Sequence, residues 1–387
     1  MAWIIERFSN IATLINGRAY LMPELLDNGK YRIVRVGNFT GKDEWFYSDM
    51  ELDDEKYCSK GDLLYKWACT FGPEIWKEEK VIYHYHIWKV VNDSSRIDKL
   101  FLYYYLKYNT PMWLGATNGS TMVHITKSSM EKKKIYIPDD LKEQKTIANI
   151  LNDYDELIEN NNKRIQLLED MAESLYKEWF VRFRLPGYKN IETKEKSAKG
   201  WVFGNHESGQ AIPESWDFDE LINIAEFKRG KNITSSKMIE GKIPVIAAGI
   251  EPSGYHNQAN VKGCSLTVSA SGANAGYLAY HLENIWAADC SYYQNDKNIW
   301  FVYNALKFLQ PVISNMQVGS AQPHVYAKNI NRLSTIIPTK EIIQKYCEKV
   351  SPFYGEIKIL KDKNELLIQQ RDSLLPRLMS GKLEVSS

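Results

Sequence analysis

Residues 147–179, IANILNDYDELIENNNKRIQLLEDMAESLYKEW, carry an apolar stripe that predicts one long helix. The spacing alternates between four and three residues, which is the heptad pattern of a coiled-coil seam. The stripe consists of Ile147, Leu151, Tyr154, Ile158, Asn161, Ile165, Leu168, Ala172, Leu175 and Trp179. A second stripe with the same spacing consists of Tyr346, Val350, Phe353, Ile357, Leu360, Asn364, Leu367, Arg371, Leu374 and Leu378. We therefore expect two long helices, the second kinked or interrupted near its start by Pro352 and Gly355.

The helices belong to an internal repeat. Shifted by 200, residues 101–145 align with 301–345 without a gap and share 12 identities in 45 positions. Two unrelated segments of this length share about three. The identities fall on glycine, proline, aromatic and polar positions, among them Pro111 with Pro311 and His124 with His324. The chain is thus expected to contain two copies of one unit.

Each copy places strands before its helix. Residues 81–91 and 265–269 are rich in β-branched and aromatic residues, which favours strands. Residues 98–108 and 298–309 are expected as short helices, ended by Pro111 and Pro311. The predicted fold class is α+β, with two mixed domains and two long helices that pair as an antiparallel coiled coil with pseudo-two-fold symmetry.

The predicted boundaries follow from these patterns. They are a first domain over 1–140, a first long helix over 141–185, a linker over 186–212, a second domain over 213–340 and a second long helix with a tail over 341–387. A helix of about 36 residues is about 54 Å long. An antiparallel pair of that length is expected to set the domains at opposite ends of a rod.

Composition excludes several classes of protein. Hydrophobic residues make up 44% and charged residues 25% of the 387 residues, as in a globular chain. No apolar run is long enough to span a membrane, and no secretory signal is visible, so a cytoplasmic protein is expected. The five cysteines are scattered without a C-x-x-C, which indicates reduced thiols. A net charge of +1 excludes a globally basic nucleic-acid binder but not a local basic groove.

Catalytic and metal-binding patterns are missing. The chain has no phosphate loop, and the acids of residues 138–145 lie on one helical turn instead of converging from separate strands, as a metal nuclease requires. His84 and His86 alternate along the expected strand 81–91, which favours a polar strand face over a zinc site because no third ligand is spaced for it. We therefore expect neither a catalytic nor a metal site in this chain.

Four segments, in this order, resemble the specificity subunit of type I restriction-modification enzymes. The first is Ile137-Pro138 with residues 142–147, KEQKTI, and the second is residues 175–183, LYKEWFVRF. The third is residues 212–216, IPESW, and the fourth is residues 371–383, RDSLLPRLMSGKL. The second copy has Ile342-Ile343-Gln344 where the first has Lys142-Glu143-Gln144, so any role of the glutamate is confined to the first helix.

The resemblance implies a non-catalytic chain whose two domains recognise an asymmetric, two-part site in double-stranded DNA. It also implies docking of two methyltransferase subunits, which use S-adenosylmethionine, and of restriction subunits, which use ATP and Mg²⁺. No cofactor is expected on this chain itself. A coiled-coil assembly or adaptor protein without DNA readout is the alternative, since the repeat and the seams fit it equally well.

DNA contacts are expected from matching loops, where glycine allows close approach of the backbone. The candidates in the first domain are Ser120, Thr121, His124 and Lys127, with Lys66 and Thr70 in a further loop. Those in the second domain are Ser320, Gln322, His324 and Lys328, with Ser269, Ser271 and Asn274 in the further loop.

One asparagine interrupts each apolar stripe, Asn161 as the fifth member of the first and Asn364 as the sixth member of the second. In an antiparallel pair these positions face each other. The two amides are therefore expected to meet and to fix the register of the helices, with Ile147 near Leu378 and Trp179 near Tyr346.

Overall fold

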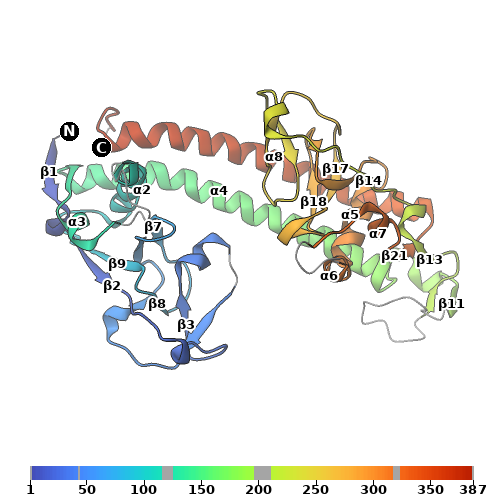
Figure 1. Cartoon of the computed structure of the whole chain (residues 1–387), viewed down its shortest axis with the longest axis horizontal. Coiled ribbons are helices and arrows are strands. Elements are labelled where there is room, and N and C mark those ends of the chain that lie inside the picture. The colour runs from blue at the N-terminus through green and yellow to red at the C-terminus, as the bar shows by residue number, and fades with distance from the viewer. Residues whose placement is uncertain (1, 42–43, 116–124, 196–210, 317–322, 386–387) are drawn as a thin grey trace. The chain divides into compact units, whose positions relative to one another are not determined.

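The chain divides into two units that each combine one β-rich domain with parts of both long helices. The computed structural model describes residues 2–41, 44–115, 125–195, 211–316 and 323–385. Unit 1 comprises residues 1–160 and 363–387, and unit 2 comprises residues 161–362. The long helices are α4 (Leu141–Tyr176) and α8 (Lys340–Met379), drawn in green and red in Figure 1. The α+β fold class with two packed long helices is confirmed.

Unit 1 contains two four-stranded sheets and a strand pair. The first sheet has the antiparallel order β2 (Ala12–Asn16), β9 (Ile87–Asn92), β6 (Leu63–Lys66) and β7 (Gly72–Ile75). The second has the order β4 (Phe46–Ser48), β3 (Tyr31–Val34), β8 (Val81–Tyr83) and β5 (Tyr57–Cys58), with β3 and β8 parallel. β1 (Trp3–Arg7) pairs with β10 (Lys134–Pro138). The helices are α1 (Phe8–Ile11), α2 (Lys99–Gly115) and α3 (Lys127–Glu131), with short 3₁₀ turns η1 (Met22–Glu24), η2 (Val36–Thr40) and η3 (Asp54–Lys56).

Unit 2 repeats this arrangement. Its four-stranded sheet has the order β14 (Lys228–Arg229), β20 (Cys290–Tyr293), β17 (Ser265–Ser269) and β18 (Leu278–His281). A smaller sheet has the order β16 (Gly254–His256), β15 (Ile243–Ile246) and β19 (Trp286–Ala287), with β15 and β19 parallel. β13 (Asp217–Glu220) pairs with β21 (Ser334–Ile337), and β11 (Thr193–Glu195) pairs with β12 (Ala211–Pro213). The remaining elements are α5 (Ile299–Phe308), α6 (Gln310–Asn315), α7 (Ala327–Asn331), the π-helical turn η4 (Lys177–Val181) and the 3₁₀ turns η5 (Tyr188–Asn190), η6 (Leu221–Asn223), η7 (Ser235–Lys237) and η8 (Gly272–Asn274).

The strand registers confirm the internal repeat. In unit 1, Lys66 of β6 lies opposite Ile87 of β9. In unit 2, Ser269 of β17 lies opposite Cys290 of β20. Both residues end equivalent strands, so the expected correspondence of the Lys66 loop with the Ser269 loop holds.

Two glycines mark the same close approach in both units. A Cβ added to Gly17 would lie 2.4 Å from the carbonyl oxygens of Tyr83 and His84. A Cβ added to Gly230 would lie 2.4 Å from the carbonyl oxygen of Ala288. Both glycines also donate a backbone hydrogen bond to the adjacent strand, β9 or β20. Only glycine fits where the chain passes this closely beneath a strand end.

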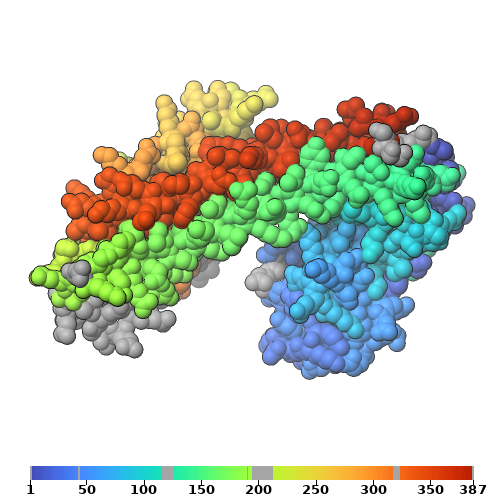
Figure 2. Space-filling model, turned by 180° about the vertical axis from the view of Figure 1, so that it is seen from behind, coloured from blue at the N-terminus to red at the C-terminus, as the bar shows by residue number. Residues whose placement is uncertain are grey.

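The long helices run antiparallel within each unit. In unit 1, Ile147 and Leu378 belong to one buried core, which also holds Phe101 and Tyr104 of α2. In Figure 2, cyan α2 packs against the first half of α4. In unit 2, the rings of Trp179 and Tyr346 lie 5.9 Å apart. The expected contact of Trp179 with Tyr346 is therefore confirmed, and Ile147 and Leu378 lie in one core, as expected. Asn161 is counted with unit 2 and Asn364 with unit 1, so their pairing stays a prediction.

Three local predictions are wrong. Residues 81–91 are not one strand, because the chain turns at residues 84–86, where the amide of Ile87 bonds back to the carbonyl of His84. The second is that α2 continues through Pro111 and ends at Gly115. Pro111 removes only one backbone bond from a helix that buried residues hold in place.

The predicted interruption of the second long helix is the third difference, because α8 is continuous from Lys340 to Met379 through Pro352 and Gly355. A kink at these residues stays a prediction. Val350, Tyr354 and Ile357 are buried on either side of the proline, and their packing keeps the helix intact. The predicted linker 186–212 also contains ordered structure, since β11 and β12 pair at its two ends. The predicted domain boundaries remain proposals.

Candidate nucleic-acid interface

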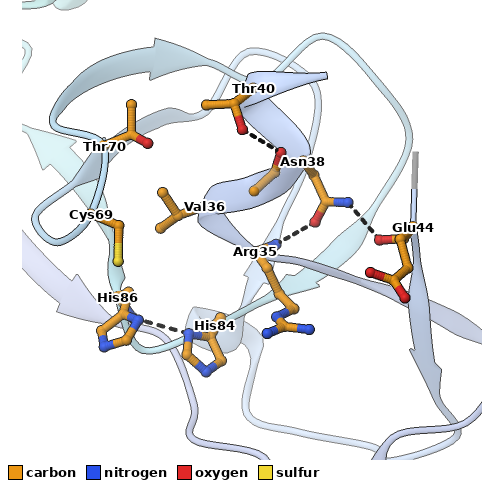
Figure 3. A pocket seen from close by; sticks show the side chains of 10 residues that line it. Arg35, Val36, Asn38, Thr40, Glu44, Cys69, Thr70, His84 and His86 are labelled. Atoms are coloured by element: carbon orange, nitrogen blue, oxygen red, sulfur yellow. Dashed lines mark hydrogen bonds between the residues drawn. The ribbon is translucent and has the colours of Figure 1, made fainter. Parts of the chain in front are cut away.

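A cavity in unit 1 lies where three strands end. It has a volume of about 450 Å³ and opens between the loop after β3, the β6–β7 turn and the β8–β9 turn (Figure 3). Its lining residues are Arg35, Val36, Gly37, Asn38, Thr40, Glu44, Cys69, Thr70, His84 and His86. These turns connect sheet strands of both sheets, so the scaffold fixes their positions while their side chains remain open to a ligand.

The loop after β3 satisfies its own polar groups. The Asn38 side chain accepts a hydrogen bond from the Arg35 amide at 2.8 Å and donates one to the Glu44 carbonyl at 3.0 Å. The Thr40 hydroxyl donates to the Gly37 carbonyl at 2.8 Å. Asn38 and Thr40 thus shape the loop, and the charged ends of Arg35 and Glu44 are left for other contacts (Figure 3).

Arg35 is exposed and held by an aromatic ring. Its guanidinium carbon lies 5.0 Å from the ring centroid of Phe46, within the range of a cation–π contact. Within the described part of the chain, no carboxylate forms an ion pair with Arg35. Its hydrogen-bond donors are therefore oriented without being neutralised.

Two neutral histidines form another side of the cavity. Their rings lie 4.8 Å apart, and the His86 amide donates to His84 Nδ1 at 3.5 Å. Burial, and then the charges of His86 and Arg35, lower the pKa of His84 to about 4. Burial and the Arg35 charge also lower the pKa of His86. At neutral pH both imidazoles are uncharged, and the occupied Nδ1 places the His84 proton on Nε2, where it can be donated.

Aromatic side chains support the β8–β9 turn. Trp67 stacks on Trp88 at 5.8 Å and meets the edge of the His86 ring at 5.2 Å. Its indole N–H donates to the carbonyl of Tyr85 at 2.9 Å. Tyr85 itself is exposed at the tip of the turn. The turn that carries both histidines is thus fixed by a rigid aromatic base.

Unit 2 places different chemistry at the equivalent turn. Between β19 and β20 stand Ala288 and Asp289 instead of the histidine turn. Asp289 accepts a hydrogen bond from the Ser271 hydroxyl and lies 3.9 Å from the Arg229 guanidinium. Here an acceptor carboxylate, partly occupied by its neighbours, takes the place of neutral imidazoles.

The structure brings some predicted residues of unit 2 together. Ser271 and His324 form an isolated antiparallel β-bridge. The His324 ring stacks on Tyr326 at 5.7 Å. Asn274 lies three residues beyond Ser271 in the same turn, whereas Ser269 is buried and donates its hydroxyl hydrogen to the Ala248 carbonyl at 3.0 Å. Ser120, Thr121, His124, Ser320 and Gln322 lie outside the described residues.

The predicted lysines and Thr70 have varied surroundings. Lys66 is buried, with its ammonium 3.4 Å from Glu74 and 4.7 Å from the Phe39 ring centroid, which favours a structural role. Thr70 lines the cavity.

The remaining two lysines do not occupy matching positions. Lys127 is the first residue of α3, whereas Lys328 is the second residue of the equivalent α7. Lys127 lies 3.9 Å from Glu131, and Lys328 lies 5.7 Å from the Tyr326 ring centroid.

Sequence reasoning missed Arg35, Glu44, His84 and His86 as parts of one site. Arg35 directly follows a strand-like run, and the two histidines were assigned to a continuous strand. Polar residues at the ends of strands could have indicated this site in the sequence. His84 and His86 lie at a strand end only because the chain turns at residues 84–86, and the sequence did not reveal that turn. No group of three or more His, Cys, Asp or Glu side chains in the described ranges is placed to hold a metal ion.

Comparison with known proteins decides the family. The type I restriction modification DNA specificity domain matches residues 3–170 and again residues 213–369, which together make up most of the chain. The chain belongs to this family. It is a specificity subunit, the non-catalytic chain of type I restriction enzymes that recognises DNA target sequences. The two matches coincide with the two copies of the internal repeat.

Relatives of this specificity subunit come from more than one organism. The MjaIX specificity subunit of Methanocaldococcus jannaschii is 28% identical over 313 residues, which cover 74% of this chain and 69% of the relative. The MjaVIII specificity subunit of the same organism is 23% identical and covers 85% and 80% of the two chains. The crystal structure of the S subunit from M. genitalium is 20% identical, with a TM-score of 0.61 over 98% of this chain and 96% of that one, and shares its fold.

No helix in the described part of the specificity subunit combines the length and apolarity that crossing a membrane requires.

Proposed function

We propose that this specificity subunit reads two different half-sites separated by unread base pairs, one half-site with each domain. The observation that carries the proposal is the difference between equivalent turns. The β8–β9 turn presents His84 and His86, whereas the β19–β20 turn presents Asp289. Because hydrogen-bond donors and acceptors discriminate between base edges, two domains with one topology and different turns favour two different sequences.

The proposed contacts lie in the loops at these strand ends. They include Thr70 in the first domain and Ser271, Asn274, His324 and Lys328 in the second. Ser120, Thr121, His124, Ser320 and Gln322 remain part of the proposal on sequence grounds. Lysine contacts to phosphate would position the duplex, and contacts to base edges would select the sequence.

We further propose that the long helices dock two methyltransferase subunits and, through the same core, restriction subunits. Exposed apolar side chains on these helices support a docking role, since they cover no core of this chain. They are Leu157, Leu167, Met171, Ile359, Leu366 and Ile368. S-adenosylmethionine, ATP and Mg²⁺ would be bound by those partners and not by this chain. A complex that acts on genomic DNA is expected in the cytoplasm.

The helix lengths support a proposal for the spacer. α4 has 36 residues and α8 has 40 residues. At ~1.5 Å per residue a helix of this size measures roughly 50–60 Å. A span of that length corresponds to about one and a half turns of DNA, at about 34–36 Å per turn.

Modified-base sequencing tests the bipartite site. DNA from cells that express this subunit with its methyltransferase should carry methylation in an asymmetric two-part motif with a constant gap. A palindromic or contiguous motif would contradict the proposal. Binding of the purified complex to that motif, compared with a scrambled duplex at a stated salt concentration, separates sequence-specific from electrostatic binding.

A further inference from the structure

The charges around the cavity of unit 1 favour a neutral ligand group. Arg35 contributes one positive charge and Glu44 one negative charge, while His84 and His86 are uncharged at neutral pH. A phosphate would gain from the guanidinium but would be repelled by the carboxylate. A base edge, which carries partial charges of both signs, complements such a mixed lining better.

The two charged side chains are suited to reach a base pair from the rim. Both are exposed, so a duplex does not have to enter the cavity to meet them. They project from the same loop on either side of Asn38, whose two hydrogen bonds fix the backbone at both positions (Figure 3). Stacking on Phe46 further limits the rotamers of Arg35, which lowers the entropy lost on binding.

We propose that this cavity reads a G·C base pair in the major groove, with Arg35 donating to guanine N7 and O6 and Glu44 accepting from cytosine N4. This assignment rests on the proposed function. Arginine offers the two parallel N–H groups that match the guanine edge, and a carboxylate is the natural acceptor for the amino group of the paired cytosine. His84 lies beside Arg35 and presents a neutral Nε2–H as an additional donor.

The assignment is specific to the first domain. The loop of unit 2 that matches the loop of Arg35 follows β15 and begins with Ala247 in place of the arginine. At the turn that matches the histidine turn, Asp289 already accepts from Ser271 and lies near Arg229. Arg229 comes from β14, not from the loop that matches Arg35. The G·C contact is therefore expected in only one of the two half-sites.

The experiment compares the wild-type complex with three variants by methylation kinetics and binding on a set of duplexes. Each duplex changes one base pair of the motif. Wild-type protein should lose affinity roughly 10- to 100-fold when one particular G·C pair is replaced. Arg35→Ala should abolish this discrimination at that pair and leave discrimination elsewhere intact. Glu44→Ala should relax preference at the same pair.

Arg35→Lys separates base reading from phosphate binding. Lysine keeps the charge but lacks the planar fork, so preference at the G·C pair should fall nearly as far as in Arg35→Ala. The opposite result would be that Arg35→Lys keeps the preference for the G·C pair, and that Arg35→Ala binds all duplexes more weakly with a smaller salt dependence. That result would identify a phosphate contact and overturn the proposal.

Arg32→Ala is the matched control. Arg32 lies on β3, pairs with Glu78 at 2.6 Å, packs on the Trp45 ring and does not line the cavity. Its loss therefore removes an equal charge and leaves Arg35 and Glu44 themselves present. Its base preference should match that of wild type. A motif without a G·C pair would refute the inference, and so would unaltered base preference of Arg35→Ala at every position. In either case, methylation of a bipartite motif by the wild-type complex would still support the proposed function.

Discussion

The two units use different side chains to hold a domain against the long helices. In unit 2 the contact is aromatic, since the Phe180 ring lies 4.9 Å from Phe301, 5.2 Å from Tyr346 and 5.6 Å from Trp216. At the equivalent place in unit 1 stand the aliphatic side chains Leu378 and Met379, in a core whose aromatic members, among them Phe101 and Tyr104, come from the domain. The repeat thus preserves the backbone geometry of the junction and not its chemistry.

Polar contacts differ in the same way. In unit 1, Asp155 of α4 accepts hydrogen bonds from Tyr104, at 2.8 Å, and from Arg371 of α8. Arg371 stands at an apolar position of the heptad stripe, and this ion pair explains its presence. In unit 2, Glu169 accepts from Tyr280. A hydrogen bond between a tyrosine and a carboxylate occurs in both units, but non-equivalent residues of the repeat form it. This hydrogen bond is therefore not part of what the two copies share.

The largest expected effect comes from Phe180→Ala. Because Phe180 is fully buried among five aromatic rings, its removal should lower the free energy of unfolding by about 3–5 kcal/mol. Met379→Ala in unit 1 should cost about 2–3 kcal/mol. Denaturant unfolding measures the loss, and hydrogen exchange assigns it to a unit. Leu167→Ala, at a side chain 62% exposed, is the control and should change little. Equal losses in both units would show that the aromatic junction has no special weight.

Asp155→Asn should cost about 2–3 kcal/mol, because it removes the carboxylate that accepts from both Tyr104 and Arg371. The largely buried guanidinium of Arg371 then keeps only its ion pair with Asp372. Burial has the largest influence on the pKa of Asp155 and raises it, but the Arg371 hydrogen bond, the Lys107 charge and the Tyr104 hydrogen bond together hold the pKa below its ordinary value.

The pH dependence follows from that direction. Since the folded pKa lies below the unfolded value of about 3.9, the stabilisation is complete above the unfolded pKa and is lost as the pH falls through the folded pKa. Wild-type unfolding free energy should therefore fall more steeply than that of Asp155→Asn below about pH 4. Parallel curves for the two proteins would show that Asp155 contributes no pH-dependent stability.

Gly17→Ala and Gly230→Ala test what the repeat preserves. Each added Cβ would meet backbone carbonyls, so each variant should lose about 1–3 kcal/mol, in its own unit. Gly355→Ala is a matched control inside α8, where a Cβ meets nothing within 4 Å. Since alanine favours a helix over glycine, this control should gain about 0.5–1 kcal/mol. Thermal unfolding measures the stability of all three variants. If only one of Gly17→Ala and Gly230→Ala is destabilised, the two copies of the repeat do not share this structural constraint.

The smallest expected effect concerns helix register. If Asn161 and Asn364 pair, a double-mutant cycle with alanine should give a coupling of about 0.5–1 kcal/mol. Asn364 is 7% exposed, so either single substitution removes the same buried hydrogen bond, and the double variant loses it only once. The paired variant Asn152→Ala with Asn364→Ala serves as the control, because Asn152 bonds to Glu156 on its own helix. Additive losses in the Asn161–Asn364 cycle would remove this pair as a register determinant.

Periodic features of the sequence predicted the fold well, and local features did not predict the site. The long helices followed from two heptad stripes. Counting along the stripes placed Trp179 against Tyr346, and Ile147 in one core with Leu378. The turn at His84 did not follow, because β-branched and aromatic neighbours mask a turn that a bond from Ile87 stabilises. The cavity joins three loops that lie far apart in sequence, and no periodicity connects them.

Lys107 and Lys307 occupy the same position of the repeat, and each forms a salt bridge with a carboxylate of α4. Lys107 lies 3.5 Å from Asp155, and Lys307 lies 2.8 Å from Glu173. α8 supplies neither carboxylate. This asymmetry sets a rule for building chimeras: a second domain grafted from a relative must match the α4 of its host and not only the α8 that follows it. Exchanging Glu173 together with the graft is the smallest change that carries the ionic anchor along.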